Sequence, residues 1–541
     1  MFTNNGKKLL TFACVLTLII GLFSLGATAV EEEEKYGGTL TFPLPYGGSL
    51  ETLDPMDSSQ VMAWKIADDL GDGLLEFDYA NLEPQPSIAK EWEIEENVYT
   101  FHLREGVQFA EGYGEVTAED FLYTFKKALN PDKPTRSASL LFAIEGAEAY
   151  KNGEADEIKG INVLDPYTLE ITLKSTTPSF VYTMCSPRFS VVPEEAVEEY
   201  GDRFGSNFVS AGPFKLVRWV RGNKVEVEAN ENYYRGKPYL DKIEYQVMPE
   251  PSARITAFKS GDLDFDIVTA SMYSQYKENP EYEDQLIEVA ELWTRLVDFN
   301  LRREKWQDVR VRKAFNYAID KETLVKEFLG DKAVVATGFL PTPSPGFNPD
   351  LEGYEYDPEK ARELMEEAGY SEDNPLEFTC VGLNDPSWGA QAAQALVPYL
   401  EEAHFDPNVE QIDGSTLWDR RSRAEFDTSI ASTGLALVSP VEYLRNQYHG
   451  NLSAGEGNTG GYQNEEFDQL IDEASNTVDQ EKRFELVHEA EKIMLDDAPS
   501  FFWNYNKAVG IQQPWVHGFV PSAKDMILQP LDQVWLDPDH Q

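Results

Sequence analysis

Strand and helix patterns alternate along the whole chain, and this alternation limits the folds that the chain can adopt. Residues 168–173 (TLEITL) alternate apolar and polar side chains, which predicts a strand. Residues 118–129 (AEDFLYTFKKAL) repeat apolar side chains every three or four positions, after Thr117 as N-cap and before Pro131, which predicts a helix. Such mixing predicts an α/β or α+β protein. The same helical spacing recurs at residues 309–319, 358–368, 465–474 and 480–495.

The length and the charge narrow the possible functions. A chain of 541 residues is expected to form two or more domains or lobes, at roughly 100–200 residues per domain. Its 95 Asp and Glu against 46 Lys and Arg give a formal net charge of −49, which repels polyphosphate, so we expect no nucleic-acid partner. Apolar residues make up 42% of the chain, too many for a disordered acidic protein. Three cysteines and six histidines leave little for a disulfide scaffold or a transition-metal site, so we expect no metal and no cofactor.

The N-terminus has the layout of a secretory signal peptide. A short basic segment precedes an almost wholly apolar stretch at residues 9–25, and the triplet 27–29 (ATA) supplies small side chains for cleavage. We expect a signal peptide at residues 1–29, cleaved near Ala29, and an acidic linker at 30–36. The alternative is an uncleaved membrane anchor, because the 17 residues of the stretch nearly reach the roughly 20 needed to span a bilayer. Cleavage predicts an exported protein, either periplasmic or at the cell surface.

Catalytic and metal-binding motifs match only in part. Residues 455–460 satisfy GxGxxG, but they follow a polar stretch and not a strand, so we expect a loop and no dinucleotide site. Residues 262–266 (DLDFD) space three acids as an EF-hand loop begins, but Ile267 stands where the loop needs glycine. The alternation of these acids with apolar residues predicts a half-exposed strand. No metalloprotease, serine-hydrolase or P-loop motif is present in the sequence, and we expect no enzyme, although a catalytic carboxylate pair would have no local motif.

Two cysteines, Cys185 and Cys380, would remain after removal of the signal peptide. Export permits a disulfide between them, because exported proteins fold in oxidising compartments. Two separate buried thiols explain the same sequence equally well.

Short motifs follow one another in an order that is typical of one family. Through them the chain resembles the extracellular solute-binding proteins of ABC importers, family 5, the dipeptide- and oligopeptide-binding group. The motifs are GGTL at 37–40, TLDP at 52–55, GLLEFD at 73–78, YTFHLREGV at 99–107, TAED at 117–120, GPFKL at 212–216, NENYYRGKPYLD at 230–241, SGDLD at 260–264, RVRKAF at 310–315, AIDK at 318–321 and YDPEKA at 356–361.

The resemblance implies a two-lobed periplasmic-binding-protein clamp of the large, type II-like kind, whose lobes are joined by a hinge and close on a ligand. Lobe I would comprise residues 37–292 and 506–541, with an extra subdomain inserted at about 76–188. Lobe II would comprise residues 293–505. The resemblance also implies a monomer that binds a small-molecule solute and delivers it to an ABC permease and ATPase.

One segment departs from the pattern of the resembled family. Its peptide binders carry a stretch FD-x5-WGADYPDP, whose first Asp after Trp-Gly-Ala pairs with the α-amine of the ligand, since a buried ammonium needs a compensating carboxylate. Residues 426–440 keep the register of this stretch, but Thr433 replaces the Trp and Ala436 replaces the Asp. An oligosaccharide, which is held by flat aromatic faces and short polar side chains, is therefore an alternative to a peptide ligand.

Candidate ligand contacts come from three places in the resembled fold. The segment at residues 426–440, called here the pocket segment, supplies small polar or apolar residues. The second lobe supplies tryptophans, and the two hinge crossings supply aromatic residues. For the tryptophans and for the residues at the crossings, packing in a core is the competing interpretation. The candidates are Trp293, Trp388, Trp418, Ser432, Thr433, Ala436, Tyr443, Trp503 and Tyr505.

Overall fold

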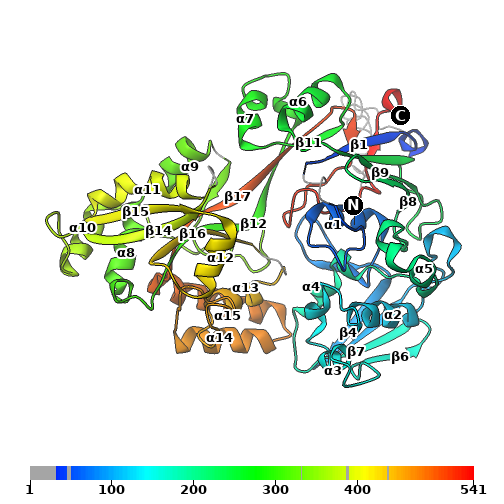
Figure 1. Cartoon of the computed structure of the whole chain (residues 1–541), viewed down its shortest axis with the longest axis horizontal. Coiled ribbons are helices and arrows are strands. Elements are labelled where there is room, and N and C mark those ends of the chain that lie inside the picture. The colour runs from blue at the N-terminus through cyan, green and yellow to red at the C-terminus, as the bar shows by residue number, and fades with distance from the viewer. Residues whose placement is uncertain (1–31, 46–49, 331, 385–388, 435–437) are drawn as a thin grey trace, which may run out of the picture.

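The structure is a computed structural model that describes residues 32–541 except 46–49, 331, 385–388 and 435–437. The predicted signal peptide and its cleavage site lie outside the described residues. Within the described part, no helix has both the length and the apolar character needed to cross a bilayer. The chain forms two lobes, which are joined by two long strands (Figure 1).

The first lobe contains a mixed sheet in the order β1-β10-β9-β8. Its strands are β1 (Thr39–Leu44), β10 (Lys242–Val247), β9 (Lys224–Ala229) and β8 (Phe214–Val220), of which β1 and β10 run parallel. Helix α1 (Val61–Leu70) lies against this sheet, because Ile66 and Leu70 pack in the same core as Phe42 and Tyr245. The helix thereby places its N-terminal turn beside the second lobe.

A second, antiparallel sheet of the first lobe has the order β4-β5-β7-β6. Helix α2 (Ala118–Ala128) packs on it through Phe121 and Phe125, and the backbone N–H of Thr117 donates to the Asp120 carboxylate at 2.7 Å. The predicted helix at 118–129 and strand at 168–173 are thus confirmed to within one residue. The strands are β4 (Ala89–Glu95), β5 (Val98–Leu103), β7 (Thr168–Thr172) and β6 (Ile161–Asp165), with β2 (Leu75–Phe77), β3 (Pro84–Pro86), α3 (Ala147–Lys151), α4 (Phe180–Met184) and α5 (Glu194–Tyr200) beside them.

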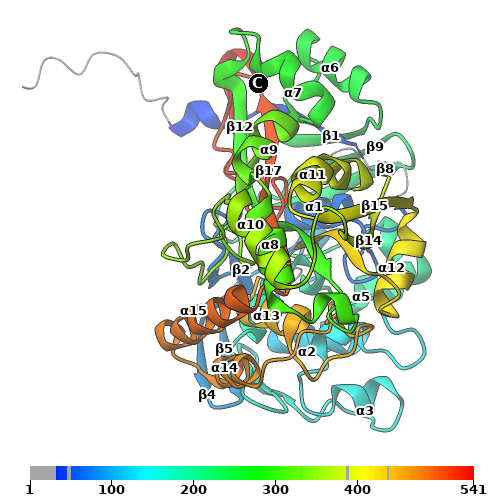
Figure 2. The same ribbon diagram turned by 90° about the vertical axis from the view of Figure 1, so that its left-hand side faces the viewer.

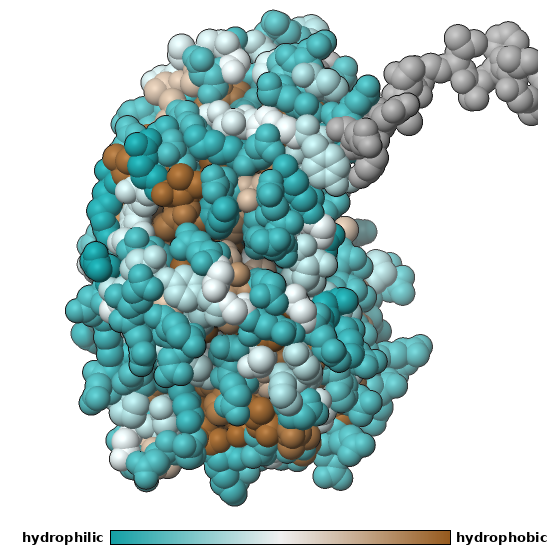
Figure 3. All heavy atoms as spheres, turned by 90° about the vertical axis from the view of Figure 1, so that its right-hand side faces the viewer, coloured by the Kyte–Doolittle hydropathy of each residue, from teal (hydrophilic) through white to brown (hydrophobic). Residues whose placement is uncertain are grey.

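The outer face of the first lobe is mostly hydrophilic, with apolar side chains gathered in small patches (Figure 3). A hydrophilic exterior of this kind suits a chain whose formal net charge is −49, because exposed charged groups remain solvated.

The second lobe is built on the larger part of a sheet in the order β11-β17-β12-β16-β14-β15, with β13 also paired to β17, while β11 and the adjoining ends of β12 and β17 pack on the first lobe. Trp306 and Phe315 fill its core, and the Trp306 ring stacks on Phe299 with centroids 4.7 Å apart. The strands are β11 (Phe265–Ile267), β12 (Leu286–Phe299), β13 (Ala333–Val335), β14 (Leu376–Leu383), β15 (Phe405–Ile412), β16 (Thr428–Gly434) and β17 (Ser500–Gln512). The covering helices are α8 (Val309–Ala318), α9 (Lys321–Leu329), α10 (Pro358–Glu367), α11 (Ala390–Glu402) and α12 (Gly414–Ser422), and α8 and α10 confirm the predicted helices.

Helices α13 (Pro440–Tyr448), α14 (Glu465–Asn476) and α15 (Gln480–Asp497) gather at one end of the second lobe (Figures 1 and 2). The last two confirm the helices predicted at 465–474 and 480–495. This end touches the first lobe, where the Ser179 hydroxyl donates to Glu442 of α13 at 3.4 Å. The lobes therefore meet at one end and leave a cleft between them elsewhere.

The strand predicted at residues 262–266 is confirmed in part, since β11 covers Phe265–Ile267, but the expectation that its acidic face is exposed is wrong. Asp264 and Asp266 are both buried around β11, beside α6 (Pro251–Ser260). Asp266 pairs with Arg254 at 2.7 Å, and Asp264 accepts the backbone N–H of Thr41 at 2.7 Å. Alternation alone does not distinguish a solvated polar face from one whose carboxylates have buried partners.

The two cysteines of the described chain are free thiols in different cores. Cys185 is buried in the first lobe and Cys380 on β14 in the second. The structure therefore agrees with two buried thiols and not with a disulfide.

Candidate ligand-binding cleft

The cleft between the lobes holds a cavity of about 700 Å³, called here the large cavity. The first lobe contributes Val61 and Met62 from the start of α1, and the second lobe contributes Phe328 and Lys332 near the end of α9. The crossing strands β12 and β17, the C-terminal segment 525–527, residues 267–269 and Ala333 form the rest of its wall. Because both lobes line this cavity, any relative movement of the lobes changes its shape.

A smaller cavity of about 200 Å³ adjoins the large one. Val61 and Asp525 line both, so the two cavities are neighbouring parts of one cleft. This smaller space, called here the aromatic cavity, is lined by Trp64, Phe77, Tyr182 and Arg188 of the first lobe, by Trp293, Gly434 and Val438 of the second lobe and by Lys524 and Leu528 of the C-terminal segment.

An irregularity in β12 turns Trp293 toward the aromatic cavity. Ala290 lies opposite Lys507 of β17 and Thr294 lies opposite Tyr505, so residues 291–293 face a single residue of the partner strand. A bulge of this kind redirects side chains at the point where it interrupts the ladder. Trp293 is accordingly 40% exposed, whereas its neighbours on both sides are buried.

The aromatic cavity carries two cationic side chains. The Arg188 guanidinium lies 4.1 Å from the centre of the Trp64 ring, and the Lys524 ammonium lies 4.7 Å from the centre of the Phe77 ring. Burial lowers the pKa of both groups, because desolvation disfavours the charged form. Cations over aromatic faces are partly stabilised by the ring quadrupole, but each retains its hydrogen-bonding capacity for an anion.

The large cavity carries charges of both signs. Burial, together with the neighbouring Asp525, raises the pKa of Glu291 to about 7, and Asn506 donates a hydrogen bond to that carboxyl group. Burial lowers the pKa of Lys332 to about 8, and its ammonium donates to the carbonyl of Thr269 at 3.0 Å. The cleft thus offers both acids and bases to a ligand that carries charge at each end.

Among the predicted contacts that the structure describes, Trp293 lines the cleft. Ser432 is buried on β16, and its hydroxyl has no hydrogen-bond partner among the described residues. The carbonyl of Thr433 accepts the Tyr443 hydroxyl at 2.6 Å, and the Tyr443 ring stacks on Phe339 with centroids 4.3 Å apart. Tyr443 therefore supports the pocket segment (residues 426–440) through its hydrogen bond to Thr433.

The other predicted contacts do not line the large cavity or the aromatic cavity within the described residues. Trp503 is fully buried in the core of the second lobe, and Tyr505 is buried with its hydroxyl bonded to the carbonyl of Gly338 at 3.1 Å. Trp418 is exposed on α12, with its ring 5.5 Å from the guanidinium of Arg421. Trp388 and Ala436 lie outside the described residues.

Sequence reasoning missed most of the aromatic cavity. Trp64, Arg188 and Lys524 are far apart in the chain, and none of them belongs to a motif with a known spacing. The only signal in the sequence is a nearby acidic or aromatic residue: each of the three lies within six residues of Asp68, Tyr182 or Asp525. Such neighbours are common in an acidic, aromatic-rich chain. Tertiary structure alone brings these residues together.

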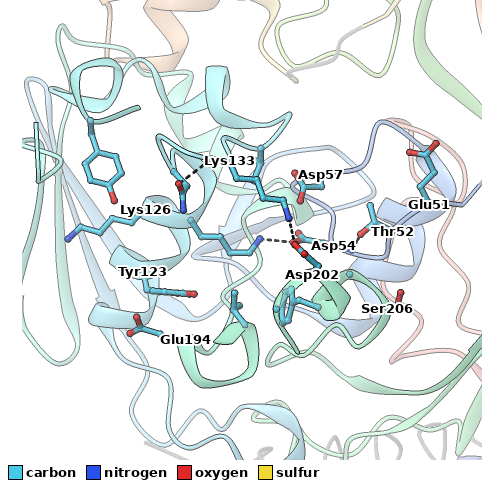
Figure 4. Close-up of a pocket in the computed structure, with 18 of the residues that line it drawn as sticks. Glu51, Thr52, Asp54, Asp57, Tyr123, Lys126, Lys133, Glu194, Asp202 and Ser206 are labelled. Carbon is cyan, nitrogen blue, oxygen red and sulfur yellow. Dashed lines mark hydrogen bonds and ion pairs between the residues drawn. The ribbon is translucent and has the colours of Figure 1, made fainter. Parts of the chain in front are cut away.

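A further polar cavity of about 600 Å³ lies wholly within the first lobe (Figure 4). Its charges are matched by neighbours in the same lobe, since Lys127 pairs with Asp54 at 2.6 Å and Lys133 pairs with Asp202 at 2.9 Å. Movement of the lobes leaves this cavity unchanged, so the cleft is the stronger candidate for a ligand-binding site.

Comparison with known proteins identifies relatives over nearly the full chain. Residues 83–455, more than half of the chain, match the family model for bacterial extracellular solute-binding proteins, family 5 middle. The chain is 27% identical to the periplasmic oligopeptide-binding protein OppA of Salmonella typhimurium, over 99% of this chain and 98% of that protein. It is 28% identical to the dipeptide-binding protein DppE of Bacillus subtilis, over 95% and 96% of the two chains.

A solved structure shares the same fold. The unliganded open form of the periplasmic murein tripeptide-binding protein MppA superposes with a TM-score of 0.83 at 24% identity, over 92% of this chain and 97% of that one. The likeness shows the two-lobed α/β fold that the motif order predicted.

Proposed function

Because the chain belongs to the bacterial extracellular solute-binding proteins, family 5, as its motif order predicted, we propose that it captures an oligopeptide between its lobes and delivers it to a membrane transporter. The observation that carries this proposal is the cleft itself, which both lobes line with aromatic and charged side chains. A ligand that contacts both lobes binds the closed form more tightly than the open one, and so shifts the population toward closure.

The division into lobes follows from the crossing strands. We propose lobe I at residues 37–292 and 506–541, with its inserted subdomain at about 76–188, and lobe II at 293–505. The bulge at residues 291–293 of β12 and the paired segment of β17 near 505 support these boundaries.

A peptide ligand requires an acid that can pair with its ammonium group. Ala436 lacks that carboxylate, but Glu291 and Asp525 bring carboxyl groups to the wall of the large cavity. Burial raises the pKa of both, and an arriving ammonium would favour their ionised forms and be compensated by them. The relatives named above are described as oligopeptide- and dipeptide-binding proteins, which supports a peptide over an oligosaccharide.

The same proposal extends to partners and location. The mature chain would act as an exported monomer, periplasmic or at the cell surface, and would present its closed form to an ABC permease and ATPase. It would release its ligand chemically unchanged, as a binding protein and not a hydrolase.

Thermal shift and calorimetry on the chain lacking residues 1–29 test the proposal. Pools of peptides of two to five residues should raise the melting temperature, since ligand at about 100 Kd adds about 2.7 kcal/mol to the free energy of unfolding. Cello-, manno- and xylo-oligosaccharides serve as the comparison. Shifts with sugars and none with peptides would overturn the peptide ligand, and peptide cleavage by the purified protein would overturn the role as a binding protein.

A further inference from the structure

We propose that the aromatic cavity is a carboxylate-binding subsite in which Arg188 and Lys524 hold an anionic group of the ligand. The inference rests on the proposed peptide function and specifies which chemical group the cleft recognises. The carboxylate could be the C-terminus of the peptide or an acidic side chain, and the two sources share the same chemistry.

Arg188 is held in place without use of its guanidinium. It follows Pro187 in a short turn, where its backbone N–H donates to the hydroxyl of Ser186 at 3.4 Å. Its guanidinium carbon lies over the Trp64 ring of α1, 4.1 Å from the ring centre, and within the described residues the guanidinium forms no ion pair and no hydrogen bond. A guanidinium stacked on an indole keeps the N–H groups at its edge available for two parallel hydrogen bonds to a carboxylate.

Lys524 approaches the same cavity from the C-terminal segment. Its backbone N–H donates to the hydroxyl of Ser522 at 3.2 Å, and its ammonium lies over Phe77. No carboxylate lies within ion-pair distance of this ammonium in the part of the chain that the structure describes. Burial lowers the pKa of Lys524, Asp68 and Asp525 act to raise it without forming an ion pair, and the positive charge of Arg188 acts to lower it, which places the two cations near one another.

Other buried cations of this protein are satisfied internally. Arg254 pairs with Asp266 at 2.7 Å and Arg421 pairs with Asp298 at 2.7 Å. Lys321, which has no carboxylate partner, donates to the carbonyl of Ala336 at 2.8 Å. In a chain with 95 acidic residues, two neighbouring cations without ion pairs are therefore a specific feature of the cleft.

The aromatic cavity lies where a bound anion would contact both lobes. It opens between the lobes, with Trp293 and Gly434 on one side and Arg188 on the other, so an anion bound there would touch both lobes. Glu291 lines the adjoining large cavity, and Asp525 lies where the two cavities meet and lines both. A peptide could therefore lie with its carboxylate in the aromatic cavity and its ammonium in the large cavity.

The test compares peptide pools that differ in one group. A randomised pool of peptides of two to five residues with free carboxyl termini is measured by calorimetry beside the same pool as C-terminal amides, each with and without Asp and Glu. The variants are Arg188→Gln and Lys524→Met, and Arg221→Gln is the matched control. Arg221 also stacks on an indole, that of Trp219 at 4.1 Å, but it lies outside the cleft.

We expect the free-acid pool to bind and each cleft variant to weaken that binding about 10- to 100-fold, the loss typical of one charge-assisted hydrogen-bonded contact. Arg221→Gln should leave it unchanged. Binding of amidated peptides only when they contain Asp or Glu would identify a side-chain carboxylate as the bound group. Equal binding of all pools, unaffected by either variant, would overturn the subsite while leaving the peptide function intact. Absence of binding by every peptide pool would overturn the peptide function and the subsite with it.

Discussion

The indole of Trp293 occupies the space that a side chain at position 434 would need. The two residues are partners in the β12–β16 ladder, and a Cβ added to Gly434 would lie 2.6 Å from the indole ring. Glycine at this position thus allows the ring to lie against β16 while its other surface faces the aromatic cavity. The position of the Trp293 ring in the cleft therefore depends on glycine at position 434.

Substitution of this glycine should displace the ring. Gly434→Ala creates a contact that a real Cβ does not tolerate, and overpacking of this kind typically costs about 1–3 kcal/mol. We expect peptide affinity measured by calorimetry to fall about 10-fold or more, together with a changed tryptophan fluorescence. Gly414→Ala is the matched control, because its Cβ would meet Leu383 at an ordinary 3.7 Å. An unchanged affinity in Gly434→Ala would contradict the role given to Trp293.

Two of the candidate tryptophans should respond in opposite ways to truncation. Trp503 is fully buried in the second lobe, so Trp503→Ala should lower the free energy of unfolding by about 3–5 kcal/mol. Trp293 is partly exposed in the cleft, so Trp293→Ala should change stability little and weaken ligand binding instead. Urea denaturation and calorimetry on both variants separate the two effects. A large loss of stability in Trp293→Ala would place this side chain in the core.

The pH dependence of stability should carry a contribution from Glu491. This carboxyl group on α15 is fully buried and accepts the backbone N–H of Leu340 at 3.2 Å, and burial raises its pKa from 4.5 to about 8. Between these two values the folded protein holds a proton that the unfolded chain has released. Stability from this group is therefore complete below about pH 4.5 and declines up to about pH 8, by at most about 1.4 kcal/mol per pH unit.

Glu491→Gln keeps an acceptor for the Leu340 N–H and removes the titration. We expect its free energy of unfolding, measured in urea from pH 5 to 8, to depend less on pH than that of the unaltered protein. Glu489→Gln, at an exposed position of the same helix, should retain the original dependence. Identical pH profiles for Glu491→Gln and the unaltered protein would show that Glu491 is ionised in the folded state.

Both thiols of the mature chain should be unreactive until the protein unfolds. Cys185 and Cys380 are buried, and burial raises the pKa of Cys380 to about 11 and that of Cys185 well above its usual range, so little nucleophilic thiolate is present. A thiol reagent at neutral pH should label neither in the native protein and both in urea without reductant. Failure to label them in urea without reductant would indicate a disulfide.

The sequence predicted the amphipathic helices well because each buries one face. Predicted residues 465–474 form a helix to Asn476, where Phe467 and Ile471 lie in the core and the acidic residues face outward. The spacing of apolar side chains along the sequence predicts this kind of one-sided burial. It failed at Asp264 and Asp266, where the alternating polar face is itself buried and matched by partners.

The candidate binding site could be predicted from the sequence only in part. Trp293 was accessible to prediction because it lies at a hinge crossing that the family resemblance locates. Arg188 and Lys524 were not, because loops of the first lobe have no periodicity and the proximity of the two cations arises only in the folded chain. A comparison with the family motif shows that a carboxylate is missing at Ala436. It does not show which residues, distant in the sequence, lie close to that position in the folded chain.

The paired strands β12 and β17 also determine what kind of motion the clamp can make. Two strands that remain hydrogen-bonded to each other on both sides of a bulge resist stretching and sideways bending. The ladder is interrupted twice within a short stretch, opposite Asn506 and at Trp503, and this stretch leaves torsional freedom. We therefore expect the lobes to rotate about a single axis, so that the empty protein explores few orientations of one lobe against the other. A ligand that closes such a clamp gives up little rotational entropy of the lobes, and more of its contact energy remains as affinity.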